Sequence, residues 1–184
     1  MAKLFVILIP NTDTIMTKGS LKTVYFCVCI QNTWNSCRKG DFKMRELANH
    51  IFAVADEHRI AITNLHLQKL LYFVMLEAIR RGKLSLRELR ELYDEPFLVW
   101  RYGPVIESIY DEYSVYGSTP IPERGEKIDD FNFLNDYIEQ NLKKSPFVLV
   151  EKSHQHRHWI KHEGEIVYGR SNVPYTFENL EEAM

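Results

Sequence analysis

The chain has 184 residues, of which 45% are hydrophobic and 12% aromatic, enough to bury one substantial core and too apolar for a disordered protein. The formal net charge is −2, but six of the 23 Lys and Arg and only two of the 25 Asp and Glu fall in residues 1–43, so residues 44–184 carry −6. An acidic surface gives no electrostatic footprint for a nucleic-acid backbone, so we expect a basic protein, not nucleic acid, as its complement.

Residues 1–43 differ from the rest of the chain. They hold all three cysteines, Cys27, Cys29 and Cys37, among scattered apolar clusters without a helical period. Residues 38–44 can be encoded by a purine-rich ribosome-binding sequence followed by a start codon. We therefore predict that translation begins at Met44 and that 1–43 is a non-native extension, with a poorly ordered N-terminal segment as the alternative. The functional domain is then 44–184.

The sequence offers no membrane span. Its longest apolar runs, 4–9 and 24–30, are far shorter than the roughly 18 residues that a spanning helix needs. Beyond Cys37 the chain has no cysteine for a disulfide framework or a thiolate nucleophile. We expect a cytoplasmic protein with no membrane partner.

Apolar residues at helical spacing predict three helices after residue 43. The first, 44–59, is amphipathic. The second begins at an N-cap, Thr63 or Asn64, and ends in a basic last turn with a glycine stop at 80–82. It is apolar on nearly every side, so we expect it at the centre of the fold. Ser85 caps a short third helix that ends near residue 92.

A short strand and a turn should follow. Pro96 forces an extended backbone and favours a strand over 97–100. Gly103-Pro104 predicts a tight turn with proline at the first position of a helix that stops at Gly117. Proline and glycine make 118–127 a loop.

The remaining residues predict two more helices and small elements. One helix is capped by Asp129 or Asp130 and ends near residue 142, and another is capped by Ser145 and runs towards His154. Residues 165–168 favour a second short strand, and Thr176 caps a final helical turn. The expected fold class is mainly α: a compact multi-helix single domain with a minor short β element.

A histidine cluster is the main candidate for metal chemistry. His154 with His158, and His158 with His162, are i, i+4 pairs that could converge on one helix face. No HExxH glutamate, cysteine or clear third ligand accompanies them, and histidines are also favoured near a helix C-terminus. We expect no metal and no cofactor, with a metal-dependent enzyme built on these histidines as an alternative.

Other catalytic motifs and a DNA-binding motif fit the sequence poorly. The chain lacks a phosphate-binding glycine loop, a GxSxG elbow and a dinucleotide fingerprint, so no catalytic residue is predicted. The first two predicted helices could form a DNA-binding helix-turn-helix. A recognition helix, however, exposes Arg, Asn or Gln along one side, whereas this second helix carries only His66, Gln68 and Lys69 near its start.

Trp100-Arg101-Tyr102 is the clearest candidate for a protein contact, because Trp, Tyr and Arg supply most interface hot spots. A Trp and a Tyr beside a Gly-Pro turn also commonly pack the start of the next helix. Both interpretations stay open, and they are compatible because a rigid platform makes a good binding surface.

Two segments resemble a known family. Residues 62–73 read Ile-Thr-Asn-Leu-His-Leu-Gln-Lys-Leu-Leu-Tyr-Phe, and residues 100–105 read Trp-Arg-Tyr-Gly-Pro-Val. Together with Ser153-His154 and Trp159, they are similar to the SocA-like Panacea domain of bacterial and phage antitoxins, a family that includes phage-associated GepA-like proteins. The resemblance runs from Met44 to Tyr175, and residues 1–43 match nothing in it.

The resemblance implies a mainly helical antitoxin domain, not an enzyme, that neutralises a toxin encoded by an adjacent gene through direct protein-protein binding. One branch of the family delivers the toxin to a protease instead, so a proteolytic adaptor is the alternative function. The candidates for partner binding are Gln68, Lys69, Tyr72, Trp100, Arg101, Tyr102 and Trp159.

Overall fold

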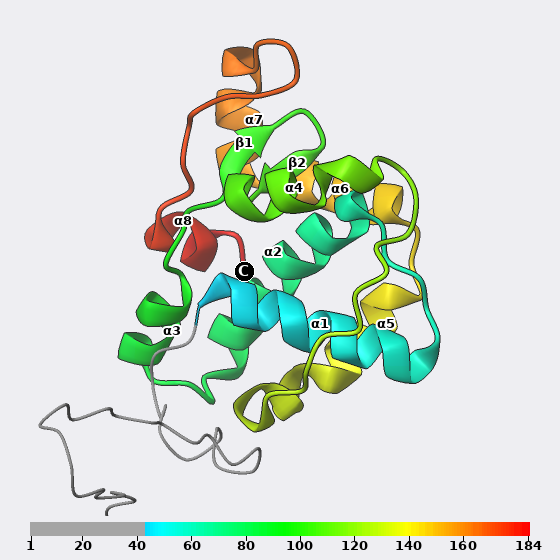
Figure 1. The fold of residues 1–184 in the computed structure, drawn as a ribbon. Helices are drawn as coiled ribbons and strands as arrows, with labels where there is room; N and C mark the ends of the chain where they lie inside the picture. The colour runs from blue at the N-terminus through cyan, green and yellow to red at the C-terminus, as the bar shows by residue number, and fades with distance from the viewer. Residues whose placement is uncertain (1–42) are drawn as a thin grey trace, which may run out of the picture. The chain divides into compact units, whose positions relative to one another are not determined.

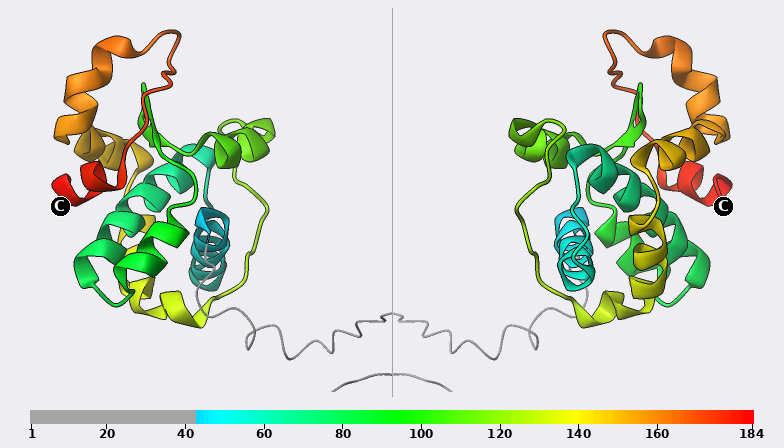
Figure 2. Two further views of the ribbon diagram at one scale, coloured as in Figure 1. Left: turned by 90° about the vertical axis from the view of Figure 1, so that its left-hand side faces the viewer. Right: turned by 90° about the vertical axis from the view of Figure 1, so that its right-hand side faces the viewer.

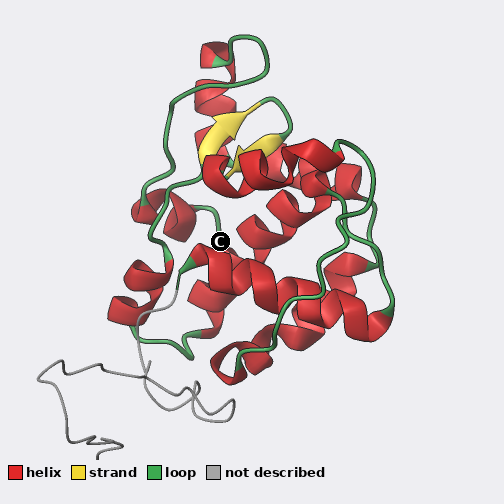
Figure 3. Ribbon diagram, viewed as in Figure 1, coloured by secondary structure: helices red, strands yellow, loops and turns green. Residues whose placement is uncertain are grey.

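The computed structural model describes residues 43–184 (Figure 1). The predicted extension, with its three cysteines, lies outside the described residues except for Lys43. Within 43–184 the chain is mainly α, with eight α-helices and one two-stranded sheet, as predicted (Figure 3). The α-helices are α1 (Met44–His58), α2 (Asn64–Arg81), α3 (Leu86–Leu92), α4 (Glu107–Tyr113), α5 (Asn135–Leu142), α6 (Pro146–His154), α7 (Arg157–His162) and α8 (Phe177–Glu182).

Helix α2 is the central element of the domain. Thr63 caps it, with its hydroxyl accepting a hydrogen bond from the His66 N–H, and Gly82 ends it in the left-handed conformation at φ 58°. Its buried residues run almost without interruption from Asn64 to Ala78, and it packs against α1, α4, α5, α6 and α8. The prediction of a helix surrounded on several sides is confirmed.

The predicted caps of three other helices are also confirmed. Ser85 and Glu88 form a capping box at the start of α3, and Thr176 accepts from the Asn179 N–H at the start of α8. Ser145 precedes α6, which has Pro146 in its first turn. These local signals are strong because each one satisfies a backbone N–H that a helix leaves unpaired.

The prediction for Gly103-Pro104 is wrong. These residues form strand β2 (Gly103–Val105), which pairs antiparallel with β1 (Leu98–Trp100) around the turn Arg101-Tyr102, and α4 begins only at Glu107. Proline lacks an N–H for a sheet ladder and is tolerated on an edge strand, so the Gly-Pro signal fitted both outcomes. The minor β element is therefore a hairpin.

Two further expectations need correction. Asp129 and Asp130 do not cap an α-helix but begin the 3-10 helix η3 (Asp129–Leu134), which buries Phe131 and Leu134 at the i, i+3 spacing of such a helix. Residues 165–168 do not form a strand, because the 3-10 helix η4 (Glu163–Glu165) is followed by a tight turn. The third 3-10 element described is η2 (Ser114–Tyr116).

The outer edge of β1 is covered by residues 169–175, which we name the strap. The N–H of Val99 donates to the Val173 carbonyl, and the N–H of Tyr175 donates to the Phe97 carbonyl, at 3.0 and 2.7 Å. Figure 2 shows the strap descending beside the hairpin from the end of α7 towards α8. Among residues 43–184, no helix combines the length and the apolarity needed to cross a membrane.

Candidate protein-interaction site

The side chains of Gln68 and Lys69 hold the outer edge of β2. Lys69 Nζ donates to the Pro104 carbonyl at 2.6 Å, and Gln68 Oε1 accepts from the Ile106 N–H at 2.9 Å. Both side chains are buried. The pair occupies the position that a third strand would take, and so fixes the hairpin to the first turns of α2.

Lys69 is an unusual residue for this task, because it is fully buried and no acidic side chain pairs with it among the described residues. Burial lowers the pKa of Lys69 well below its usual range, which shifts the amine towards the neutral form. A neutral amine still donates to the Pro104 carbonyl. Lys69 therefore acts as a structural donor and does not present a charge at the surface.

Gly103 fits tightly against this pair. It has φ 88°, and an added Cβ would lie 2.3 Å from Ser153 Oγ and 2.9 Å from Lys69 Nζ. Ser153 is itself buried on α6, where its hydroxyl donates to the Val150 carbonyl. The hairpin can approach α2 and α6 this closely only because the residue after the turn has no side chain.

Trp159 holds the other side of the hairpin. Its indole Nε1 donates to the Trp100 carbonyl at 2.9 Å, and its ring stacks on His154 with the centroids 3.7 Å apart. Burial lowers the pKa of His154, which favours a neutral ring in this stack. The Ser153-His154 and Trp159 positions thus brace the turn from α6 and α7.

The Trp100 ring is buried and makes a second set of contacts. It packs edge-on against Tyr110, with centroids 5.0 Å apart, and the Arg170 guanidinium lies 4.3 Å from its centroid. Arg170 also forms ion pairs with Glu107 and Asp111 at 3.5 and 3.9 Å. These exposed pairs add little stability individually, but they place a cation over the aromatic ring.

Arg101 and Tyr102, between the two strands, are exposed, and half of the Tyr102 surface is accessible. The Arg101 guanidinium lies 5.8 Å from the Tyr102 ring centroid and forms no ion pair with residues 43–184. Both side chains are therefore available to a partner, on a backbone that neighbouring elements hold from several sides.

Tyr72, another predicted candidate, lies deep in the core. Its hydroxyl is 2.7 Å from His156 Nδ1, and its ring contacts those of Phe97 and Tyr175. Burial raises the pKa of Tyr72 and lowers that of His156, which favours a neutral phenol hydrogen-bonded to a neutral imidazole. Tyr72 therefore supports the core next to the start of β1 and the end of the strap.

The seven predicted site residues therefore lie in three settings. Gln68, Lys69 and Tyr72 are buried, Trp100 and Trp159 pack at the base of the hairpin turn, and Arg101 and Tyr102 face solvent. The sequence did not single out Arg170 or Tyr168, which lie beside the turn. A Tyr-Gly pair at 168–169 is a weak signal for a two-residue turn and was the available clue.

Only one of the two predicted histidine pairs lies on a shared helix, His158 with His162 on α7. α6 ends at His154 and α7 begins at Arg157, so His154 and His158 do not share a helix face. His158 and His162 are neighbours, with ring centroids 4.7 Å apart, but His162 Nδ1 lies 2.6 Å from a Glu165 carboxylate oxygen. No group of three His, Cys, Asp or Glu side chains within 43–184 is placed to hold a metal ion.

The start of α2 is not arranged as a DNA-recognition helix. His66, Gln68 and Lys69, the polar side chains that could have read a groove, are each at most 4% exposed. His66 Nε2 is 3.3 Å from the Asn141 carbonyl on α5. Because all three are committed to intramolecular contacts, none is available to read base edges.

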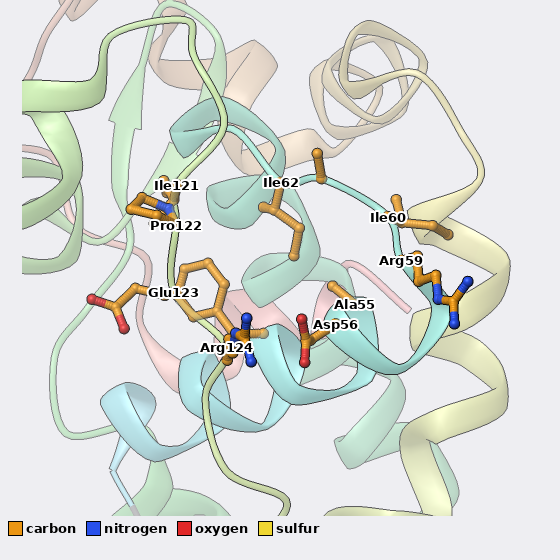
Figure 4. A pocket seen from close by; sticks show the side chains of 11 residues that line it. Ala55, Asp56, Arg59, Ile60, Ile62, Ile121, Pro122, Glu123 and Arg124 are labelled. Carbon is orange, nitrogen blue, oxygen red and sulfur yellow. The ribbon is translucent and has the colours of Figure 1, made fainter.

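A pocket of about 270 Å³ lies elsewhere, between the end of α1, the α1–α2 connection and the loop over 118–127. Figure 4 shows Ile121 and Pro122 of the loop facing Ile62, with the charged side chains of Asp56 and Arg124 nearby. None of the predicted site residues lines this pocket. The hairpin turn and its supports therefore form the candidate site.

Comparison with protein families gives one match to this region. Residues 67–160, a little more than half of the chain, match the family described as "Antitoxin SocA-like, Panacea domain". No curated protein and no solved structure matches the chain. The matched range begins one residue before Gln68 and ends one residue after Trp159, so it contains every predicted site residue.

Proposed function

Because the chain belongs to the SocA-like Panacea antitoxin family, we propose that it neutralises one cognate toxin by binding it directly, without catalysis. The toxin is the protein encoded by the adjacent gene, and the complex forms in the cytoplasm. The observation that carries this proposal is that the candidate residues within 67–160 divide into a buried group and an exposed group. The side chains of the other five candidates are buried or, for Trp159, half-buried, whereas Arg101 and Tyr102 are presented to solvent.

The hairpin turn suits protein recognition on physical grounds. Tyr and Arg give large contact area and directional hydrogen bonds, and both are enriched at interface hot spots. A turn whose backbone is already fixed loses little entropy on binding, so more of the interaction energy appears as affinity. We assign toxin contact to Arg101 and Tyr102. Of the other five candidates, Gln68, Lys69, Trp100 and Trp159 hold the turn in place, and Tyr72 stabilises the core.

The test is rescue from growth arrest. Expression of the adjacent gene should arrest growth, and co-expression of this chain should restore it. The purified proteins should form a complex in size-exclusion chromatography. Arrest that persists despite well-expressed, folded chain would contradict the proposal. An unrelated toxin gene serves as a control for a general effect on expression.

The same experiment separates masking of the toxin from delivery to a protease. Under direct neutralisation, the half-life of the toxin after translation is blocked should be unchanged or longer when this chain is present. Rescue accompanied by faster loss of the toxin would instead support the adaptor mechanism.

A further inference from the structure

A second turn lies beside the hairpin turn and has an uncommon backbone. The N–H of Val167 donates to the Arg170 carbonyl at 2.8 Å, and the N–H of Arg170 donates to the Val167 carbonyl at 3.1 Å. Between them Tyr168 has φ 51° and Gly169 has φ 90°, so both central residues are left-handed, as in a type I′ turn. Asn, Asp or Gly is the usual first central residue of such a turn.

Tyr168 is therefore strained, and the domain gains no visible packing in return. Its side chain is fully exposed, at 103% of the reference accessibility, and Val167 is 63% exposed. A left-handed conformation is unfavourable for a residue with a Cβ, and a bulky aromatic in it is uncommon. Because strain of this kind concentrates at functional sites, the exposed Tyr168 calls for an explanation outside the folding of this domain.

The two turns are joined to each other. The N–H of Arg101 donates to the Gly169 carbonyl at 3.0 Å, and a Cβ added at Gly169 would lie 4.0 Å from the Arg101 Cβ. We name the exposed side chains of Arg101, Tyr102, Val167 and Tyr168 the two-turn tip. Figure 1 shows the two turns at the end of the domain that also holds α7. Neither turn, 100–103 or 167–170, contains an acidic residue.

We propose that the two-turn tip is the anchor that inserts into the toxin, with Tyr168 and Tyr102 entering an apolar recess and Arg101 facing a carboxylate on its rim. This inference rests on the proposed function and extends it to the chemistry of the partner. Two tyrosines and an apolar valine favour a desolvated recess, and the arginine without an ion pair favours an acidic group beside it. The net charge of residues 44–184 is negative, whereas the charged side chains of the two turns are all basic, so the tip differs from the rest of the domain in the sign of its charge.

The decisive variant is Tyr168→Asn, because asparagine adopts the left-handed conformation more readily than tyrosine. The full chain with this change should unfold at the same temperature as wild type or a few degrees higher. Its dissociation constant for the protein encoded by the adjacent gene, measured by calorimetry, should rise at least about tenfold. A residue needed only for the fold would not give lower affinity together with unchanged or higher stability.

Two further variants complete the test. Phe147→Ala removes another exposed aromatic, on α6 and outside the tip, and should leave the dissociation constant within about twofold of wild type. Arg101→Glu should weaken binding more than Arg101→Gln, because it places two carboxylates opposite each other.

The possible results separate the inference from the function on which it rests. Wild-type chain that neither rescues growth nor binds contradicts both. Wild-type rescue with Tyr168→Asn binding as tightly as wild type overturns the anchor and leaves the antitoxin proposal standing. Equal affinity of Arg101→Glu and Arg101→Gln would contradict the proposal that Arg101 faces a carboxylate at the rim of the recess in the toxin.

Discussion

The buried pair Gln68-Lys69 and the exposed turn Arg101-Tyr102 both belong to the family-like segments, yet they meet opposite environments. The first pair forms hydrogen bonds with the backbone of β2 and of the residue that follows it, at Pro104 and Ile106. The second pair has its side chains in solvent. Residues of the family-like segments can therefore have two different roles, and burial distinguishes those that hold the hairpin turn from those exposed on it.

The two kinds of position should respond differently to mutation. Changes among the supporting residues should lower the free energy of unfolding and affect toxin binding through the fold. Changes at the exposed turn should weaken toxin binding and leave the free energy of unfolding nearly unchanged. The predictions below run from the largest expected effect on the free energy of unfolding to the smallest.

The largest effect is expected for Gly103→Ala. The new methyl group would overlap Ser153 Oγ and crowd Lys69 Nζ at a residue with φ 88°, so unfolding should become easier by about 3 kcal/mol or more. Gly82→Ala is the matched control, because Gly82 also has positive φ but no atom within 4 Å of the added Cβ. It should cost about 1 kcal/mol, measured by urea denaturation. Equal losses would contradict the tight packing of the hairpin.

Gln68→Ala should come next. It leaves the buried Ile106 N–H without an acceptor, which should reduce the free energy of unfolding by about 1–3 kcal/mol. Gln155→Ala, at an exposed position after α6, should change it by less than about 0.5 kcal/mol. If Gln68→Ala is as mild as this control, the support assigned to Gln68 is wrong.

Acidification should also destabilise the buried core, which contains several histidines, whereas no histidine lies in the exposed turn. Burial lowers the pKa values of His50, His66 and His156 in the folded state, so the unfolded chain binds more protons as the pH falls below about 6.5. Their stabilisation is complete above that pH and is lost as the pH drops through the folded pKa values. Between pH 7.5 and 5.5 the free energy of unfolding, measured by urea denaturation, should therefore decrease. Histidine NMR resonances that titrate at or above pH 6.5 would contradict this.

The smallest effect on stability is expected for Tyr102→Ala. Tyr102 is half exposed, so its removal should change the free energy of unfolding by less than about 0.5 kcal/mol. Its effect on toxin affinity should be about 2 kcal/mol or more, as for a hot-spot aromatic. A variant that is destabilised but still binds normally would place Tyr102 among the supporting residues.

Much of the fold could be predicted from local signals. The apolar period and caps of α2, and the caps at Ser85, Ser145 and Thr176, each act within a few residues of the chain. The hairpin could not be predicted in this way. The outer edge of β2 is satisfied by Gln68 and Lys69, more than thirty positions earlier in the chain, and no local pattern reports such a partner.

The candidate site divides along the same line. The sequence singled out Trp100, Arg101 and Tyr102 because helical periodicity does not explain these residue types. It could not tell which of the three side chains would be buried. It also missed Tyr168, because that residue resembled part of a strand. Its importance depends on a positive φ and on a hydrogen bond between two separate turns.

Hydrogen–deuterium exchange of the full chain, with and without the protein encoded by the adjacent gene, tests the central claim most directly. The account predicts that binding slows exchange in residues 100–103 and 167–170, with little change in the loop over 118–127 that borders the pocket. Slower exchange in that loop, with both turns unchanged in a stable complex, would contradict it.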